Sequence, residues 1–292
     1  MSESTSVTEP IVPELPEVER ATALLRDAIV GATLIQAEVL HPSLKRRLPR
    51  GALQSLSSTR VERVERRGKH QLVHLGDGRV LHVHFRMNGD WIFDTDDDPL
   101  PRFARAVFHF SNGRRVVLED SRALSTIDVH PSGSDLSLDL GPEPYDSALT
   151  PSTFLAGLRR RRTPIKVALL DQRIIAGLGN IYASEALWRA KLSPKLIASS
   201  LTLPQARRLL VAIRAVIRRA TGGRYTQSEN ARLDVYDRED ALCRRCRTPI
   251  ARFVQAGRST YYCPYCQGSE KSKTLSRRPR ARRSSGRSSQ EH

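Results

Sequence analysis

The four cysteines are the residues whose spacing most directly indicates a chemistry. They form two Cys-x2-Cys pairs, Cys243 with Cys246 and Cys263 with Cys266, and sixteen residues separate the pairs. This pattern is typical of a tetrahedral thiolate site for one zinc ion. Two disulfides or a redox-active pair are the alternatives, and both are disfavoured because the first residues do not read as a secretory signal and no other cysteine competes. Four thiolates fill the coordination sphere, so we expect the zinc to be structural.

The chain of 292 residues is strongly basic, with a formal net charge of +17. Residues 271–292 hold eight Lys or Arg, one acidic residue and six serines, a composition that predicts a disordered tail. A basic protein with a zinc ribbon favours nucleic acid as its partner, because basic segments attract phosphates; a tail that serves only solubility is the alternative. No apolar run could span a bilayer, and residues 1–12 contain no Lys or Arg. We therefore expect a cytoplasmic protein without a membrane partner.

Hydrophobic spacing divides the chain into a β-rich part and a helical part, which is an α+β, multidomain class. Leu15, Val18, Leu25 and Ile29 recur with helical spacing before Gly31. Short runs separated by turn residues then predict an antiparallel β-sandwich with this helix on its flank. The runs lie at 33–40, 60–64, 70–75, 80–85, 104–110 and 116–119, and helices are predicted at 151–160, 164–171, 180–190 and 204–220.

Three separated motifs contain the remaining candidate functional residues. Residues 13–19 read PELPEVE, residues 177–185 read GLGNIYASE, and residues 257–267 read GRSTYYCPYCQ. Together and in this order they resemble the formamidopyrimidine-DNA glycosylase and endonuclease VIII family of base-excision repair enzymes, most closely its formamidopyrimidine branch. The resemblance implies a β-sandwich, a helix–two-turn–helix domain and a zinc-finger hairpin. The predicted divisions are an extension (1–12), a catalytic domain (13–132), a linker (133–149), a helix–two-turn–helix domain (150–235), a zinc finger (236–270) and a disordered basic tail (271–292).

The resemblance implies a bifunctional enzyme, a DNA glycosylase that is also an abasic-site lyase. It would act as a monomer on double-stranded DNA that carries abasic sites or oxidised bases such as formamidopyrimidine and 8-oxoguanine. The family's nucleophile is the secondary amine of an N-terminal proline, and Pro13 is the matching residue. An α-amino group titrates near ~8, against ~10.4 for lysine, so much more of it is neutral near pH 7. Its attack on the sugar C1′ would expel the base, and β- and δ-elimination would then cut the strand.

Three further residues match catalytic positions of the family. Glu14 would protonate the deoxyribose ring, which requires a raised pKa, and Glu17 would assist. Lys69 would reach the phosphate and the lesion from the end of a β-turn. Arg258 would grip the phosphates beside the lesion and assist δ-elimination. The alternatives are that the two glutamates complement a helix N-terminus and that Lys69 is a surface residue.

Five residues match DNA-binding positions of the family. Met87 would fill the gap left by the flipped nucleotide, and Arg122 would face the estranged base. Arg161, Lys166 and Asn180 would contact the DNA backbone. The alternatives are a core position for Met87 and a solvated helix face for the arginine run that contains Arg161.

The chain departs from the family pattern in two places. Twelve residues precede Pro13, and an internal proline has no free amine. We expect that translation starts at a GUG codon read as Val12, or that trimming exposes Pro13; otherwise the chain would be a non-catalytic protein that binds damaged DNA. Leu124 replaces an aromatic wedge, and the stretch 223–233 is shorter than in purine-specific members. Excision of oxidised pyrimidines, as in the endonuclease VIII branch, is therefore a second hypothesis. A zinc-ribbon accessory factor would leave the first two motifs unexplained.

Overall fold

The computed structural model describes residues 12–45, 48, 51–221 and 233–268. The predicted tail at 271–292, residues 1–11 of the predicted extension and residues 223–232 of the short stretch lie outside the described residues. Within the described ranges, no helix is both long and apolar enough to cross a membrane.

Eight antiparallel strands form the N-terminal part. In chain order they are β1 (Thr33–Val39), β2 (Thr59–Arg67), β3 (His70–Leu75), β4 (Val80–His84), β5 (Asp90–Asp94), β6 (Ala104–Phe110), β7 (Arg115–Glu119) and β8 (Thr126–His130), with short helical turns α2 (Pro42–Lys45) and η1 (Gln54–Leu56) between β1 and β2. Their hydrogen-bonded order is β5-β7-β6-β1-β2-β3-β4-β8. The two halves of this order are joined through β1 and β2, which share only the register pairs Thr33–Arg60 and Leu34–Thr59.

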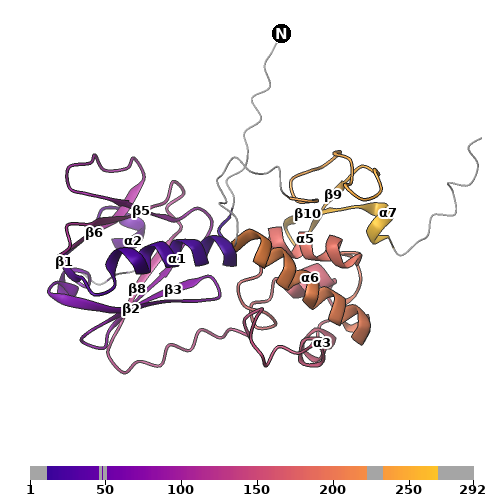
Figure 1. Cartoon of the computed structure of the whole chain (residues 1–292), viewed down its shortest axis with the longest axis horizontal. Helices are drawn as coiled ribbons and strands as arrows, with labels where there is room; N and C mark the ends of the chain where they lie inside the picture. The colour runs from indigo at the N-terminus through magenta and orange to yellow at the C-terminus, as the bar shows by residue number, and fades with distance from the viewer. Residues whose placement is uncertain (1–11, 46–47, 49–50, 222–232, 269–292) are drawn as a thin grey trace, which may run out of the picture.

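Side chains from both halves meet in one core, which confirms the predicted sandwich. Phe108 of β6 and Val116 of β7 share a buried cluster with Val73 of β3 and Leu81 of β4. The helix α1 (Leu15–Ile29) adds Leu25 to this cluster and packs on β2. Its N-terminal end lies where the strands meet the helical domain, whereas its body runs along the strands (Figure 1).

Four helices form the second part, close to the predicted ranges. They are α3 (Pro151–Arg159), α4 (Ile165–Leu169), α5 (Asn180–Ala190) and α6 (Leu203–Thr221), with the turn η2 (Ala198–Ser200) before α6. Thr150 caps α3, since its side chain accepts a hydrogen bond from the Thr153 N–H at 3.2 Å. Leu209, Leu210 and Ile213 of α6 are buried in the helical core, as the periodicity predicts.

The C-terminal hairpin consists of β9 (Ala251–Gln255) and β10 (Arg258–Tyr262), followed by α7 (Pro264–Gln267). It packs on α5, because Trp188 of α5 shares a buried cluster with Cys243, Ile250 and Cys263. The predicted four-cysteine hairpin therefore forms, and α5 packs against it.

Two strands, β5 and β8, are absent from the sequence prediction. β5 begins and ends with an aspartate, and such residues are depleted from strands. The structure resolves this conflict by pairing: the Arg115 guanidinium of β7 binds the Asp94 carboxylate at 2.8 and 2.9 Å, and both side chains are largely buried. β8 has only five residues, and Asp128 lies at its centre, where aspartate is unfavourable for a strand.

Candidate active site and DNA-binding surface

Glu14 connects the start of α1 to the start of α5. It follows Pro13, which is buried, and its own side chain is 1% exposed. The carboxylate accepts hydrogen bonds from the backbone N–H groups of Gly179 at 2.9 Å, Ile181 at 2.8 Å and Tyr182 at 3.3 Å. These N–H groups belong to the first turn of α5, where a negative charge is favoured. Glu14 therefore complements a helix N-terminus, as the alternative interpretation expects, and it also directly follows Pro13 in the chain.

The glycines of the turn before α5 allow α1 and Lys69 to approach it. Gly177 has φ +85°, and a Cβ there would lie 2.5 Å from the Leu15 side chain. At Gly179 a Cβ would lie 2.3 Å from Cδ of Glu14 and 2.5 Å from Nζ of Lys69. The Glu14 carboxyl and the Lys69 ammonium therefore converge on Gly179, and Glu14 directly follows Pro13 in the chain.

Burial shifts the pKa values of the groups that meet here. It raises the pKa of Glu14, and the charge of Lys69 and the Ile181 N–H oppose this effect. Burial also raises the pKa of Glu17, whose carboxylate accepts hydrogen bonds from the Tyr182 hydroxyl and from the Glu14 N–H. For Lys69 burial lowers the pKa, and Glu14 opposes this shift. A carboxyl group that retains its proton more readily and an amine that loses its proton more readily suit acid and base roles.

Glu143 holds the turn that carries Lys69. Its carboxylate accepts hydrogen bonds from the Gly68 N–H at 2.7 Å and from two N–H groups of Arg66, each at 3.0 Å. Burial opposes the charge of Glu143, but the Arg66 hydrogen bonds outweigh it and lower the pKa. The composition of 133–149 predicts only a linker, so sequence reasoning missed this residue.

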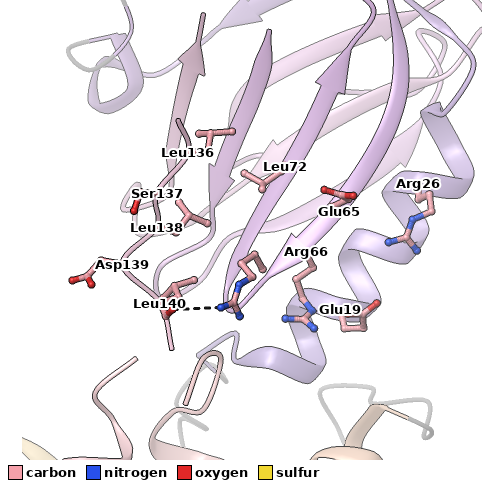
Figure 2. Close-up of a pocket in the computed structure, with 11 residues that line it drawn as sticks. Glu19, Arg26, Glu65, Arg66, Leu72, Leu136, Ser137, Leu138, Asp139 and Leu140 are labelled. Carbon is pink, nitrogen blue, oxygen red and sulfur yellow. Dashed lines mark hydrogen bonds and ion pairs between the residues drawn. The ribbon is translucent and has the colours of Figure 1, made fainter. Parts of the chain in front are cut away.

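A separate pocket lies beside this turn, where residues 136–140 run along the sheet (Figure 2). Figure 2 shows Arg66 pointing toward Glu19 of α1, with which it forms an ion pair, and Leu72 and Leu138 facing the pocket from β3 and the linker. The residues that line the pocket include neither Pro13 nor Glu14 nor Lys69. The linker therefore contacts Arg66 and Arg67, which precede the Lys69 turn, and it lies outside the group formed by Pro13, Glu14 and Lys69.

Lys166 and Asn180 join the helical domain to β10. Lys166 is 1% exposed, and its Nζ donates to Oδ1 of Asn180 at 2.5 Å, to the Ser259 carbonyl at 2.9 Å and to Oγ1 of Thr260 at 2.7 Å. The Asn180 amide also donates to the Ser259 carbonyl at 3.1 Å. Burial lowers the pKa of Lys166 to about 8. The structure thus places this lysine beneath the surface, next to the exposed Arg258 at the start of β10.

Met87 and Arg122 lie on two loops that are bonded to each other. Met87 is half-buried and Arg122 is exposed. The Asn88 amide donates to Oγ of Ser121 at 2.5 Å, which joins the two loops. Asp120 is fully buried and accepts the Arg122 N–H at 2.9 Å, which fixes the backbone of the second loop. The two residues predicted to fill the DNA stack and to face the estranged base therefore belong to one structural unit.

Arg161 is held by an ion pair. Its guanidinium donates to the Asp171 carboxylate at 2.7 Å, and its side chain is one-third exposed. The hydrogen bond from Arg173 and then that from Arg161 lower the pKa of Asp171 to about 2. The described contacts therefore bind Arg161 to the helical domain, and its contact with the DNA backbone stays a prediction.

The four cysteines form a cluster of the size that zinc requires. Their sulfur atoms all lie within 4.8 Å of one another. Cys243 and Cys266 are 4.0 Å apart, and Cys246 and Cys263 are 3.4 Å apart. A tetrahedral site with metal–sulfur bonds of about 2.3 Å places its sulfurs about 3.8 Å apart. The donor set and its spacing therefore fit a single structural zinc ion.

Three family models match the chain in sequence order. The formamidopyrimidine-DNA glycosylase N-terminal domain matches residues 12–127, the formamidopyrimidine-DNA glycosylase H2TH domain matches residues 140–230, and the zinc finger found in FPG and IleRS matches residues 242–268. The formamidopyrimidine-DNA glycosylase of Paracoccus denitrificans is 37% identical over 284 residues, covering 88% of this chain and all of that protein. The chain belongs to the formamidopyrimidine-DNA glycosylase family. Its relative in Desulforamulus reducens is 38% identical over 275 residues, covering 88% of this chain and 99% of that protein.

Solved structures of formamidopyrimidine-DNA glycosylases have the same fold. The Lactococcus lactis enzyme, bound non-covalently to DNA with an abasic site, superimposes with a TM-score of 0.82 at 30% identity, covering 87% of this chain and 99% of that one. MutM in complex with DNA that contains carbocyclic 8-oxo-G gives 0.82 at 31% identity, covering 88% of this chain and all of that one. The family assignment and the predicted fold are thus confirmed.

Proposed function

We propose that this formamidopyrimidine-DNA glycosylase family member removes oxidised bases from double-stranded DNA and then cuts the abasic strand. The observation that carries the proposal is the convergence of the Glu14 carboxyl and the Lys69 ammonium on Gly179. Glu14 directly follows Pro13 in the chain, so this arrangement supports a proton donor and a cation acting near the amine that Pro13 would offer as a nucleophile. It would act in the bacterial cytoplasm, associated with the nucleoid, as a monomer.

The first chemical step requires Pro13 to be an N-terminal residue. The family model begins at residue 12, immediately before Pro13, which supports a mature chain that starts at the proline. Its nitrogen would then attack C1′ of a flipped-out nucleotide, the bond from C1′ to the base would break, and Glu14 would supply the proton that opens the sugar ring. The resulting iminium is cationic and acidifies the C2′ proton, so the 3′ and then the 5′ phosphate can leave by elimination.

Cationic side chains would hold the DNA around this amine. Arg258 is exposed and would contact the phosphates, and its charge lowers the pKa of both Lys69 and Lys166, which lie beneath it. Met87 and Arg122, on their joined loops, would fill the vacated stack and face the unpaired base. The zinc ion would hold the hairpin that carries Arg258, and Asn180 would hold β10 in place through Ser259.

The proposed lesions are formamidopyrimidine and 8-oxoguanine. DNA containing Fapy-dG and DNA containing carbocyclic 8-oxo-G are the ligands in solved structures of relatives. The short stretch at 223–233 favours a second hypothesis, excision of oxidised pyrimidines as in the endonuclease VIII branch.

The test is single-turnover excision from matched duplexes that contain 8-oxoguanine, formamidopyrimidine or thymine glycol. The protein is prepared in two forms, one beginning at Pro13 and one retaining residues 1–12. We expect the first form alone to release a purine lesion and cut the strand, and we expect Glu14→Gln to slow release by about 10²-fold or more. Faster release of thymine glycol would favour the second hypothesis. Binding without cutting by both forms would contradict the proposed function.

A further inference from the structure

Trp188 lies at the contact between α5 and the four-cysteine site. The side chain is 4% exposed, and it shares a buried cluster with Cys243 and Cys263. Its indole Nε1 is fully buried and has no hydrogen-bond partner among the residues that the structure describes. A buried donor without an acceptor is costly, so such a group requires an explanation.

The sulfur of Cys243 supplies that explanation. Cys243 is fully buried in the same cluster as Trp188, so its sulfur lies among the groups packed around the indole ring. A zinc-bound thiolate carries negative charge and accepts N–H hydrogen bonds at longer distances than oxygen does. With the metal bound, the indole N–H therefore has an anionic acceptor.

Further contacts bind both Cys-x2-Cys pairs to the end of α5. Arg245 lies between Cys243 and Cys246 in the chain, and its guanidinium stacks 3.6 Å from the Trp188 ring centroid while donating to the Trp188 carbonyl at 2.7 Å. On the second pair, Gln267 accepts the Cys263 N–H at 2.8 Å and donates to the Leu192 carbonyl at 2.9 Å. The metal site and the helical domain thus share side chains.

We propose that Trp188 is a positioning residue of the zinc site, which donates its indole N–H to the Cys243 thiolate. Because the Arg245 guanidinium stacks on the same ring, Trp188 would stabilise both the bound metal and the packing of the hairpin on α5. This role rests on the cysteine cluster and is independent of the glycosylase chemistry. Groups that hydrogen bond to metal ligands typically change metal affinity by about 10- to 100-fold when removed. Loss of the indole N–H should therefore speed metal release about 10-fold.

The test isolates the N–H from the shape of the ring. The chain has two tryptophans, and the other, Trp91, donates to Gln71 in the β-domain. In a Trp91→Phe background, Trp188 is replaced by benzothienylalanine, which keeps the bicyclic shape but has sulfur in place of N–H. Zinc transfer to a chromogenic chelator is timed, and the thiolate-to-metal charge-transfer band is recorded after cobalt(II) substitution. The Trp91→Phe parent is the matched control.

We expect the isostere to release zinc about 10-fold faster than the parent and to shift the cobalt band to longer wavelength, because a sulfur that loses a hydrogen bond donates electrons more readily. Arg245→Gln retains the indole N–H and should leave the band in place. An isostere with the parental rate and band would overturn the proposal. The proposal would also be overturned if Trp188→Phe released zinc faster than the parent while the isostere did not. That result would show that the packing of the bicyclic ring, and not its N–H group, retains the metal.

Discussion

Substitution of Gly179 by alanine should disable the site through a single methyl group. The backbone at Gly179 has φ −131° and ψ −162°, an extended conformation that alanine adopts without strain. The new Cβ would lie 2.3 Å from Cδ of Glu14 and 2.5 Å from Nζ of Lys69, whereas ordinary contacts begin at 3.4 Å. Both groups would therefore have to move by about 1 Å.

A displacement of about 1 Å at a reacting group costs roughly 10²-fold in rate. Overpacking of this kind also costs about 1–3 kcal/mol in the free energy of unfolding. The assay is single-turnover excision with enzyme in excess, with urea unfolding measured on the same preparation. We expect the excision rate to fall about 10²-fold while the protein stays folded.

Gly157→Ala is the matched control. A Cβ at Gly157 would meet only Ile174 Cγ2 at 3.9 Å, and the position lies inside α3. Alanine there should leave the excision rate unchanged and increase stability by about 0.5–1 kcal/mol. A Gly179→Ala enzyme that excises as fast as this control would refute the claim that Glu14 and Lys69 act from their positions against Gly179.

Three more predictions follow from the described contacts. Glu143→Gln should lower the excision rate about 10-fold and the free energy of unfolding by about 1–3 kcal/mol. The reason is that it removes the charge that pairs with Arg66 behind the Lys69 turn. Glu62→Gln, at an exposed position, is the control, and an unchanged rate and stability in Glu143→Gln would contradict the prediction. Removal of zinc by a chelator should weaken DNA binding, measured by fluorescence anisotropy, and added zinc should restore it, since the hairpin carries Arg258; full affinity without metal would count against this role. The pKa of Lys166 is about 8 in the folded protein, against 10.5 for a free side chain. Between these two pH values the unfolded chain binds a proton at Lys166 that the folded protein does not. The free energy of unfolding should therefore rise by up to about 3 kcal/mol from about pH 8 to 10.5. Lys166→Met should reduce that rise in urea titrations, and an identical pH profile would show that the lysine does not titrate this way.

Local patterns predicted much of the architecture. The helical spacing of Leu209, Leu210 and Ile213 marks the buried face of α6, and the cysteine spacing marks the metal cluster. Both patterns involve residues close together in the sequence, so they can be recognised before the structure is known. β5 was missed because its terminal acidic residue Asp94 is accommodated by Arg115, a partner on another strand.

The parts of the site that sequence did not reveal depend on long-range contacts. Glu143 binds Arg66 and Gly68, more than seventy residues earlier in the chain, so nothing near Glu143 indicates its role. Lys166 was expected at the DNA backbone, and its burial against β10 follows from the docking of the zinc hairpin. The pairing of Glu14 with the first turn of α5 joins residues 165 and 167 positions apart, so no local pattern indicates it.

The most direct test of the account identifies the atom that bonds to DNA. Enzyme beginning at Pro13 is incubated with duplex DNA that contains an abasic site, reduced with borohydride, digested and mapped by mass spectrometry. The account predicts a reduced adduct on the nitrogen of Pro13, and no adduct when residues 1–12 are retained. An adduct on Lys69 or on another lysine, or trapping that persists with Pro13 internal, would contradict it.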